Sequence, residues 1–469
     1  MRTRRFVAVN LISDPIHGYI ELTKRLSPAE SAAAGLPDED VAEQDLLDTA
    51  WVQRLRRISQ LQSARWVFPT AEHSRFTHGL GVMHEAGTWA RSLYPSLRAE
   101  LGAAAEPIPS EGLVAETLRV AGLLHDVGHG PFAHFFDDHV LSAFAAPADP
   151  RRQPGKRLTH EDLSGRIIEG ELGPLIRGLR RAPGSVPERD AFATGETIDP
   201  GWVAYLISKP AIVDAAMPRW LRWLQPLLSG VFTVDNLDYV RRDAYLTGVA
   251  VGPIDVERLR RYSFISSRGL TLYEPGLGAL EIFLTARRFM YQQVYFHRTV
   301  RAIDLDLAAV FGPSVRALVG DTSPAENLSV YADLDEYALL HQAARWARGE
   351  SIAERPRPGD GMVTPAIANA WRAILLRQPT WRAEAEIRAE YEADARPEAL
   401  IATLGAPEPG RVAIDLAEVD ARPASASSTD GLLALETRDG EAASLASALA
   451  SIPAYWLIGR RYRRVAIPT

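Results

Sequence analysis

The histidines of this chain are crowded into one segment. Of the 11 histidines, eight lie between residues 73 and 160, and the chain contains no cysteine. Without cysteine it cannot form disulfides, use a thiol nucleophile, or hold zinc or an iron–sulfur cluster through thiolates. Any metal ion must therefore be bound by histidine, aspartate and glutamate. The crowded histidines are His73, His78, His84, His125, His129, His134, His139 and His160.

Composition narrows the class of protein further. A length of 469 residues predicts two or three domains' worth of mass, and 46% hydrophobic with 24% charged residues is typical of globular proteins. The net charge of −7 argues against general nucleic-acid binding, although a local basic pocket stays open. Only three lysines occur (Lys24, Lys156 and Lys209), so arginine should make most phosphate contacts. No apolar run of 18 residues or signal peptide is present, so we expect a cytoplasmic protein without a membrane partner.

Apolar residues recur every three to four positions over much of the chain, which predicts helices. Alternating stretches predict two hairpins, one pairing residues 6–12 with 20–22 and one within 262–273. Segments rich in Pro, Gly, Ser or Ala predict loops at 27–40, 146–157, 181–200 and 421–431. The predicted helices cover 45–61, 78–94, 112–126, 160–170, 201–208, 218–229, 235–246, 277–312, 333–348 and 366–376, and a last strand begins at 455.

These elements predict a mainly α fold with small β-hairpins, followed by a smaller α+β region. We expect residues 1–44 to form an N-terminal strand-and-turn segment with a loop. Residues 45–314 would form the helical core. Residues 315–469 would form the C-terminal α+β region, which could supply oligomer contacts.

The segment 121–134 carries the strongest chemical pattern. His125 and Asp126 stand side by side after an apolar helical run, so they point about 100° apart and share a cation only beside further ligands. Imidazole with carboxylate suits Fe, Mn, Zn or Co. Gly128 and Gly130 would let the chain turn sharply and aim the following histidines into the same cavity, for substrate contact or proton transfer. Taken alone, a His-Asp pair is more often a surface or core hydrogen-bonded pair.

Two later helices add candidate partners. Asp235 and Asp238 are three residues apart and could face the same way, although ordinary salt bridges and an N-terminal cap explain them as well. In the second helix, a guanidinium and two phenols spaced by four residues suit a nucleotide, while core packing of an aromatic stripe is the commoner explanation. These three residues are Arg287, Tyr291 and Tyr295.

In this order, the motifs resemble the HD-domain phosphohydrolases, and within them the sterile-alpha-motif/HD-type deoxynucleoside triphosphate triphosphohydrolases. The resemblance extends over residues 6–312, and we expect a bacterial-type chain without the sterile-alpha-motif domain. The matching segments are 14–18, 53–56, 60–61, 67–69, 75–78, 125–134, 159–161, 235–243 and 287–297.

The resemblance implies a divalent metal (Fe, Mn, Mg, Co, Ni or Zn) bound by His78, His125, Asp126 and Asp235. It implies a catalytic group around the scissile phosphate, in which His134 transfers the proton. Asp137 would orient His134, and Glu161 would support the network. The implied catalytic group is His129, His134, Asp137, His160 and Glu161.

The resemblance also implies a substrate pocket. Gln60 and Leu61 would contact the sugar, with Gln60 favouring a 3′-hydroxyl and Tyr295 excluding a 2′-hydroxyl. Arg75 and Arg287 would hold phosphates. Asn236 stands where many relatives carry a basic residue, so one phosphate contact loses its charge. The remaining implied pocket residues are Tyr239, Asp243 and Tyr291.

A second nucleotide site at a subunit interface is implied as well. Asp48, Gln53 and Arg56 resemble positions that bind a guanine nucleotide, whereas Asn10 replaces an expected lysine; a solvated helix face explains residues 53–56 equally well. Phe68 and His297 complete this set. The resemblance further implies a homo-oligomer, either a dimer or a tetramer.

The predicted function is therefore metal-dependent hydrolysis of deoxynucleoside triphosphates to deoxynucleoside and triphosphate, with a guanine nucleotide as candidate activator. Asn236 motivates a first alternative, an HD-type phosphohydrolase acting on another nucleotide or a phosphomonoester. A second alternative is a catalytically silent nucleotide sensor, although the full set of metal-type ligands argues against it.

Overall fold

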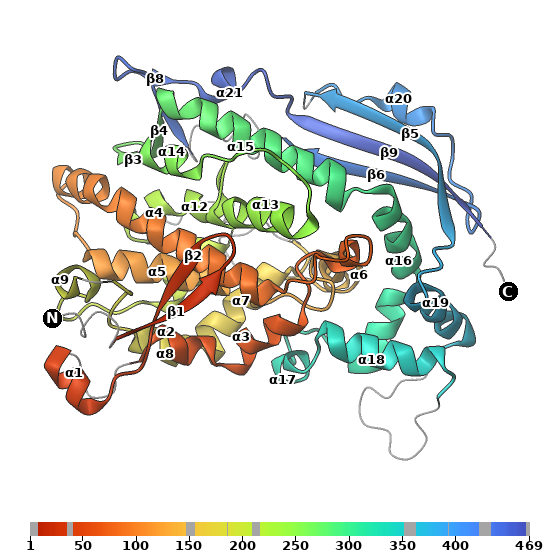
Figure 1. Cartoon of the computed structure of the whole chain (residues 1–469), viewed down its shortest axis with the longest axis horizontal. Helices are drawn as coiled ribbons and strands as arrows, with labels where there is room; N and C mark the ends of the chain where they lie inside the picture. The colour runs from red at the N-terminus through yellow and green to blue at the C-terminus, as the bar shows by residue number, and fades with distance from the viewer. Residues whose placement is uncertain are drawn as a thin grey trace.

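Helices dominate the part of the chain that the structure describes, and the strands of that part form three small sheets. This confirms the predicted mainly α fold with hairpins and a mixed C-terminal region. Figure 1 shows the helices packed together, with a three-stranded sheet along one edge. In the described ranges, no helix is both long and apolar enough to span a membrane. The computed structural model describes residues 8–34, 41–146, 155–184, 186–208, 216–350, 363–392, 394–421 and 433–465.

The predicted N-terminal hairpin is confirmed. Strands β1 (Val9–Asp14) and β2 (Gly18–Thr23) pair antiparallel. In the turn, Asp14 Oδ1 accepts hydrogen bonds from the backbone N–H groups of Ile16 and His17 at 2.9 and 3.0 Å. Gly18 has φ +75°, which an L side chain rarely adopts. The turn therefore holds the side chains of Asp14 and His17 in fixed positions.

The prediction of a loop over residues 27–40 is wrong for residues 28–34, which form helix α1 (Pro28–Ala34). Ser27 and Glu30 bond reciprocally, with Ser27 N–H donating to Glu30 Oε2 at 2.8 Å and Glu30 N–H donating to Ser27 Oγ at 3.3 Å. Such a capping box starts a helix, and the alanines that follow favour it. Residues 35–40 lie outside the described ranges.

Two long helices form the centre of the core, α4 (Arg75–Ala103) and α5 (Glu111–Leu124). Their backbones approach closely at two glycines. A Cβ at Gly122 would lie 2.8 Å from the Val82 carbonyl oxygen, and one at Gly79 would lie 3.2 Å from that of Leu123. This close approach requires glycine at both positions. It brings the start of α4 beside the end of α5, where the motif histidines lie.

Several predicted helices are interrupted. The segment 45–61 is broken because the Thr49 side chain accepts a hydrogen bond from Val52 N–H and starts a new helix there, and Pro226 interrupts 218–229. The remaining core helices are α2 (Glu43–Leu47), α3 (Ala50–Arg54), α6 (His134–His139), α7 (His160–Arg166), α8 (Gly173–Gly178), α9 (Pro187–Asp190), α10 (Pro200–Ile207), α11 (Arg219–Leu224), α12 (Pro226–Ser229), α13 (Val234–Thr247) and α14 (Val256–Arg261). Shorter helical turns are η1 (Leu55–Arg57), η2 (Gln62–Trp66), η3 (Leu141–Ala143), η4 (Ile167–Glu171) and η5 (Glu274–Gly276).

The single helix predicted over 277–312 is wrong at one point. The structure has α15 (Leu277–Met290), a π-helical turn η6 (Tyr291–Tyr295) and α16 (Arg298–Val319). His297 leaves the helical conformation, and its side chain accepts a hydrogen bond from Thr299 N–H as the cap of α16. The break is a local capping event inside a continuous apolar pattern, so periodicity alone did not reveal it.

The second predicted hairpin is confirmed as β3 (Ser263–Ser266) and β4 (Gly269–Tyr273). Strand β7 (Ala434–Glu436) pairs parallel to β4, and β8 (Ala442–Ala443) pairs with β7. The C-terminal part of the chain thus completes a sheet begun by the core. Of the predicted loops, residues 147–154 and 422–432 lie outside the described ranges, and 181–200 contains the short helix α9.

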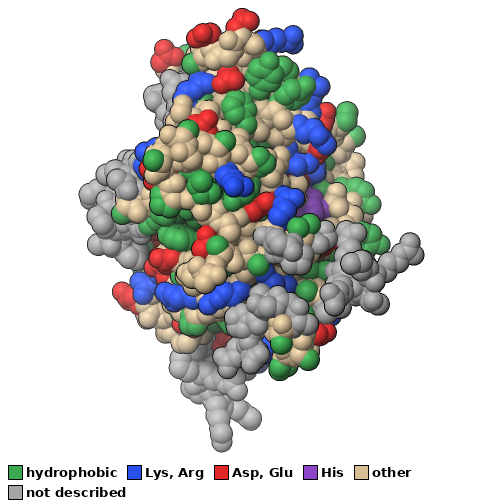
Figure 2. All heavy atoms as spheres, turned by 90° about the vertical axis from the view of Figure 1, so that its left-hand side faces the viewer, with side chains coloured by type: hydrophobic (Ala, Val, Ile, Leu, Met, Phe, Trp, Pro, Cys, Tyr) green, Lys and Arg blue, Asp and Glu red, His purple; other side chains and the backbone are tan. Residues whose placement is uncertain are grey.

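The C-terminal region carries a three-stranded antiparallel sheet beside α16. Its strand order is β5 (Trp381–Tyr391), β9 (Tyr455–Arg464) and β6 (Val412–Asp420). The first strand, β5, is rich in charged residues and forms no apolar pattern along the sequence. Its acidic side chains are stabilised by ion pairs with arginines of β9, Glu386 with Arg460 and Glu384 with Arg463. The elements of this region are α17 (Leu328–Ala332), α18 (Glu336–Ala347), α19 (Pro365–Leu375), β5 (Trp381–Tyr391), α20 (Glu398–Ala402), β6 (Val412–Asp420), α21 (Leu445–Ala448) and β9 (Tyr455–Arg464). Figure 2 shows basic and acidic side chains interspersed over the face that it displays.

Candidate active site

One cavity of about 360 Å³ collects most of the predicted site residues. It is bounded by the end of α5, by α13, by η2 and by the η6–α16 junction. Segments that are more than 240 residues apart in the sequence therefore share one space. The predicted residues that line it are Gln60, Leu61, Arg75, His125, Asp126, His134, His160, Glu161, Asp235, Tyr239, Asp243, Tyr291 and Tyr295.

Four side chains form a first cluster, which we call the metal-type cluster: His78, His125, Asp126 and Asp235. His78 Nε2 lies 3.0 Å from Asp235 Oδ1 and 4.0 Å from Asp126 Oδ2. His125 Nε2 lies 3.3 Å from Asp126 Oδ1 and 3.8 Å from Asp235 Oδ1. Two nitrogens and two carboxylates thus converge from the start of α4, the end of α5 and the start of α13.

The free electron pairs of this cluster fit a divalent cation. His125 Nδ1 lies 2.8 Å from the Gly122 carbonyl, an acceptor, so this nitrogen carries the proton. In the neutral ring Nε2 then carries the lone pair, and among the residues that the structure describes this buried atom has no hydrogen-bond partner. Neutral imidazole facing carboxylates is the donor set that Fe, Mn, Zn and Co accept. The four residues would therefore hold such an ion, and the assignment of ligands remains a prediction.

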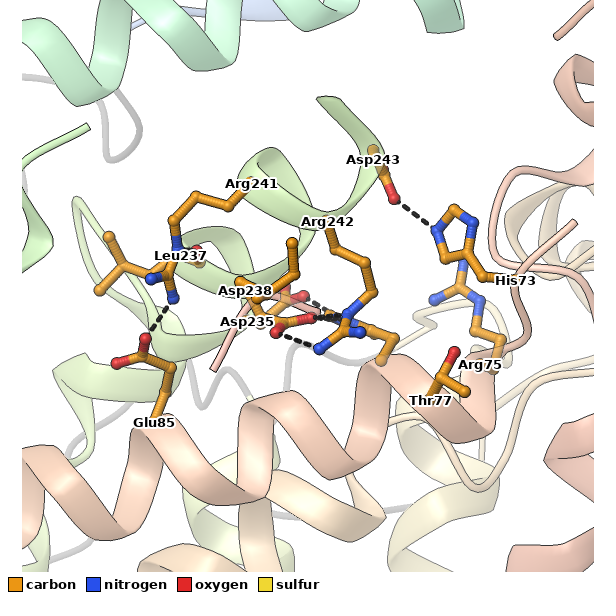
Figure 3. A network of polar contacts seen from close by, with 12 residues as sticks. His73, Arg75, Thr77, Glu85, Asp235, Leu237, Asp238, Arg241, Arg242 and Asp243 are labelled. Atoms are coloured by element: carbon orange, nitrogen blue, oxygen red, sulfur yellow. Dashed lines mark hydrogen bonds and ion pairs between the residues drawn. The ribbon is translucent and has the colours of Figure 1, made fainter. Parts of the chain in front are cut away.

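A buried network orients His78 from behind. Its Nδ1 lies 2.8 Å from Asp238 Oδ2, and Arg242 donates to both oxygens of Asp238 at 2.8 and 2.9 Å. His17 Nε2 lies 2.7 Å from Asp238 Oδ1, and Arg242 also donates to Asp14 Oδ2 at 2.7 Å. Figure 3 shows Asp238 and Arg242 facing α4 from α13. The turn of the N-terminal hairpin is thereby tied to a candidate metal ligand.

The protonation of His78 follows from this environment. Burial alone would lower the pKa of its imidazole, but the carboxylates of Asp235 and Asp238 outweigh burial and raise the pKa to about 10. His17 and Arg242 in turn help hold the pKa of Asp238 well below its usual range, against the effect of burial. A proton on His78 Nε2, which faces Asp235, thus occupies the place that a cation bound by these two residues would take.

The sequence reading missed the roles of His17, Asp238 and Arg242. It treated Asp238 as an ordinary salt-bridge partner, and the structure shows both that salt bridge and the contact with His78. The signal was present in the i, i+4 spacing of Asp238 and Arg242 and in the 14–18 motif. The alternative of Asp235 as a helix cap is wrong, because Thr233 caps α13.

A second cluster, which we call the histidine trio, comprises His129, His134 and His160 with Asp137. His160 Nδ1 lies 2.5 Å from Asp137 Oδ2, whereas His134 Nδ1 lies 3.5 Å from the same oxygen. The rings of His129 and His160 stack with centroids 3.7 Å apart. Both ring nitrogens of the fully buried His129 lack a hydrogen-bond partner among the described residues. His134 and His160 line the cavity, so they are the members of the trio that a polar ligand can reach.

The trio combines charged and neutral rings. Burial, together with the nearby His160 and Arg75, lowers the pKa of His129 well below its usual range, so its ring is neutral near pH 7. Burial opposes a charge on His160 as well, but Asp137 prevails and raises its pKa. The trio therefore contains one ring without an acidic proton to donate and one ring with raised proton affinity, and general acid–base catalysis needs groups of both kinds.

The turn between the clusters works differently from the prediction. Gly128 and Gly130 supply space rather than an unusual backbone, since a Cβ would lie 2.2 Å from the His160 carbonyl oxygen at the first and 2.7 Å from the Phe136 ring at the second. The positive φ angles belong to Phe132 at 60° and Ala133 at 47°. The strain therefore lies directly before His134, at the start of α6.

Asp126 joins the two clusters. Its Oδ1 lies 3.3 Å from both His125 Nε2 and His129 Nε2, and its Oδ2 accepts a hydrogen bond from Arg75 Nη1 at 2.6 Å. Burial would raise the pKa of this carboxyl, but Arg75 and the two histidines lower it far below its usual range. Asp126 is thus an anion that faces the metal-type cluster, the trio and an arginine at once.

The substrate residues divide into two groups. Asp243 lines the cavity, held by His73 Nε2 at 2.7 Å and by the Tyr295 hydroxyl at 2.6 Å. Asn236 and Arg287 are absent from the lining that the structure describes. Asn236 Oδ1 accepts two hydrogen bonds from Thr233 in the cap of α13. Arg287 donates to the Tyr239 hydroxyl at 3.2 Å and to the Asp420 carbonyl at 2.8 Å.

The residues predicted for a second nucleotide site lie outside this cavity. Asn10 donates to Gln44 Oε1 at 2.9 Å, and Gln53 accepts from Arg56 at 2.7 Å. The Arg56 guanidinium lies over the Phe76 ring, while Phe68 and His297 contact each other edge to face. Asp48 ends α2. These contacts neither support nor oppose the assignment, which remains a prediction.

Comparison with known proteins places the chain. Residues 75–182 match the HD domain, and residues 254–355 match the HD associated region. This chain contains an HD domain. The HD match contains most of the metal-type cluster and the whole histidine trio, whereas Asp235 lies between the two matches.

Curated relatives of this HD-domain protein are moderately similar. The uncharacterized protein YwfO of Bacillus subtilis is 29% identical over 350 residues, covering 72% of this chain and 66% of its own length. The deoxynucleoside triphosphate triphosphohydrolase SAMHD1 of Bos taurus is 26% identical over 314 residues, covering 65% of this chain and 47% of its own. The chain thus spans about half to two thirds of these relatives.

Solved structures show the same fold over nearly the whole chain. A hypothetical protein from Aquifex aeolicus superposes with a TM-score of 0.64 at 23% identity, covering 97% of this chain and 96% of its own. A phosphohydrolase from Bacteroides thetaiotaomicron superposes with a TM-score of 0.63 at 20% identity, covering 97% and 100%.

Proposed function

We propose that this HD-domain protein is a metal-dependent deoxynucleoside triphosphate triphosphohydrolase, which releases deoxynucleoside and inorganic triphosphate. The observation that carries the proposal is the position of Asp126, within 3.3 Å of a nitrogen from each histidine cluster and 2.6 Å from Arg75. In the proposal, the metal-type cluster binds the metal ion, the histidine trio transfers the proton and Arg75 binds phosphate, all at one cavity wall. The relatives named as deoxynucleoside triphosphate triphosphohydrolases support this substrate class.

The chemistry follows from the residues around Asp126. A divalent ion held by the metal-type cluster would supply a Lewis-acid charge that polarises a phosphoryl oxygen. Arg75 would stabilise negative charge that develops on the α-phosphate as water attacks phosphorus and the bond to the 5′-oxygen breaks. His134, whose side chain is 60% exposed at the cavity, would protonate the leaving 5′-oxygen. Triphosphate and deoxynucleoside would then depart.

The sugar end of the cavity has a fixed wall. The Tyr295 hydroxyl donates to Asp243 at 2.6 Å, and its ring packs against Tyr239 and Tyr291 with centroids 6.2 and 4.9 Å apart. A phenol held on both sides cannot swing away to admit a larger sugar. In the proposal, this wall rejects a 2′-hydroxyl while Gln60 receives the 3′-hydroxyl.

The test is product analysis. The protein is incubated with each deoxynucleoside triphosphate and Mn²⁺, Mg²⁺, Fe²⁺ or Co²⁺, and the products are separated by ion exchange. We expect deoxynucleoside and triphosphate in equal amounts. Release of pyrophosphate or orthophosphate instead, or no reaction with any of these metals, contradicts the triphosphohydrolase assignment.

A second candidate function rests on the positions of Asn236 and Arg287. Both side chains bond within the protein, so the arginines that line the described cavity are Arg75 and Arg301, each already beside carboxylates. A cavity with so little free positive charge also suits a less charged substrate, such as a nucleoside monophosphate or another phosphomonoester. Comparing kcat/KM for mono-, di- and triphosphates of one deoxynucleoside separates the two functions.

Regulation and assembly belong to the same proposal. We propose that a guanine nucleotide bound near Asn10, Gln53 and Arg56 activates a homo-oligomer. Adding GTP to the assay should raise the rate and, in sedimentation, shift the protein towards a dimer or tetramer. An unchanged rate and mass at saturating GTP would remove this part of the proposal and leave the hydrolysis untouched.

A further inference from the structure

A polar group lines the cavity that neither cluster uses. We call Ser63, Arg301 and Asp304 the α16 group, since two of its members lie on α16 and η2 packs beside that helix. Ser63 Oγ donates to Asp304 Oδ1 at 2.5 Å, and Arg301 Nη1 lies 3.3 Å from Asp304 Oδ2. Burial raises the pKa of the Asp304 carboxyl to about 6, so it is an anion above neutral pH. A mostly buried carboxylate facing a cavity is a candidate for ligand recognition.

The charge of this group indicates which part of a nucleotide it can meet. Arg301 also binds Asp415 on β6 at 2.5 Å, so one guanidinium serves two carboxylates. The local sum is one net negative charge, which repels phosphates. Arg75 and the histidines occupy the other polar wall. The neutral end of a nucleotide, its base, therefore fits the α16 group best.

Hydrogen-bond capacity selects among the bases. Each oxygen of Asp304 accepts one bond within the protein and keeps a further acceptor site. Arg301 uses Nε and Nη2 on Asp415, and its fork leaves N–H groups next to Asp304. Two acceptors beside a donor complement an edge with two neighbouring donors beside an acceptor. Guanine has that edge, with N1–H, the 2-amino group and O6.

Apolar side chains in the same cavity supply the faces that a flat base needs. Leu61, Phe135, Phe296 and Val300 all line it. Val300 lies one position before Arg301 on α16, and Leu61 lies two positions before Ser63, so apolar and polar contacts come from the same two elements. Base recognition by apolar faces with a few polar groups at one edge is the common arrangement of such pockets.

We infer that Asp304, positioned by Ser63 and Arg301, is a specificity-determining residue that selects guanine in the cavity. The inference rests on the proposed function for its substrate class. Thymine lacks two adjacent donors, and adenine and cytosine each present one amino group beside an acceptor. Of the four bases, guanine is the one that can donate a hydrogen bond to each oxygen of the Asp304 carboxylate.

The experiment compares dGTP with dITP, which lacks only the 2-amino group. Dissociation constants are measured by calorimetry at pH 8 with Ca²⁺, on the full-length protein. We expect dGTP to bind about tenfold more tightly than dITP, since a hydrogen bond to a charged group is lost. In Asp304→Asn the ratio should fall to within about twofold, because one acceptor becomes a donor. Asp306→Asn is the matched control: this carboxylate lies two residues further on α16, bonds to Thr380 and does not line the cavity, so its ratio should stay at the wild-type value.

Equal affinity of the wild type for dGTP and dITP overturns the inference, whether or not the variants fold. An unchanged tenfold ratio in Asp304→Asn overturns it as well. Because binding is measured apart from turnover, these results do not depend on triphosphate release. Failure of the proposed function would appear only in the product analysis.

Discussion

The two histidine clusters of the cavity are held in different ways. In the metal-type cluster, each imidazole is fixed from behind, His78 by Asp238 and His125 by the Gly122 carbonyl. In the trio, Asp137 is shared between His134 and His160, and His129 has no hydrogen-bond partner among the described residues. A cation needs ligands at fixed positions, whereas proton transfer needs nitrogens that are free to exchange partners. The difference in support therefore matches a division of labour between the clusters.

The first prediction removes a metal ligand. His125→Ala should abolish detectable hydrolysis and weaken metal binding by more than about a hundredfold, since even losing a group that supports a ligand costs about 10- to 100-fold. Metal content after loading is measured by plasma mass spectrometry. His341→Ala, an exposed histidine on α18, is the control and should keep its metal. If His125→Ala still binds the metal ion as the wild type does, His125 is not a metal ligand and the role assigned to the metal-type cluster is wrong.

The second prediction addresses the trio. His134→Gln should lower kcat by about 10²- to 10⁴-fold, because general acid catalysis is lost, while the metal content stays at the wild-type level. The side chain is 60% exposed, so the melting temperature should not change. Loss of metal in this variant would show that the two clusters do not have separate roles.

The third prediction tests the support of His78. Asp238→Asn should weaken metal binding about 10- to 100-fold, because the amide no longer holds both His78 and His17 as a carboxylate does. Metal affinity is measured by competition with a chelating dye. If only the melting temperature falls and affinity stays unchanged, Asp238 has a purely structural role.

The fourth prediction concerns pH. Burial opposes ionisation of Asp137, but His160 and His134 lower its pKa, and Asp137 raises that of His160. Because the pKa of Asp137 is lowered, its carboxylate stabilises the fold at pH values above its ordinary pKa of 3.8. Because the pKa of His160 is raised, its imidazolium stabilises the fold fully at pH values below its ordinary pKa of 6.5. Asp137→Asn should therefore lower the free energy of unfolding by about 2 kcal/mol between these values. The loss should shrink as pH falls below 3.8 and as it rises through the raised pKa of His160, as urea unfolding at several pH values would show. A loss independent of pH would exclude a charged pair.

The smallest effect concerns the turn before the trio. Ala133→Gly should raise the free energy of unfolding by about 1 kcal/mol, because glycine tolerates φ 47° without strain. Ala99→Gly, on the exposed side of α4, has an ordinary helical backbone and should instead lose about 1 kcal/mol. Equal losses in both variants would show that the turn stores no strain.

Much of the fold was predictable because its signals are local. Periodicity predicted α4, α5 and α13, and alternation predicted both hairpins. The errors lie where a single side chain or a distant strand decides. At His297 one helix ends, and the His297 side chain caps the next helix. The charged segment β5 forms a strand because arginines more than 70 residues away form ion pairs with its glutamates.

The sequence by itself determined the chemistry available to this protein. Without cysteine, any metal must be bound by nitrogen and oxygen, and the crowding of histidines located the candidate ligands. Only the tertiary structure decided which groups meet. It placed Asp126 between the two clusters and brought Asp304 beside Ser63. It also gave Arg287 and Asn236 hydrogen-bond partners within the protein. Spacing along one helix fixes direction on that helix, but distances between elements depend on packing of the whole core, such as the contact of Gly122 with α4.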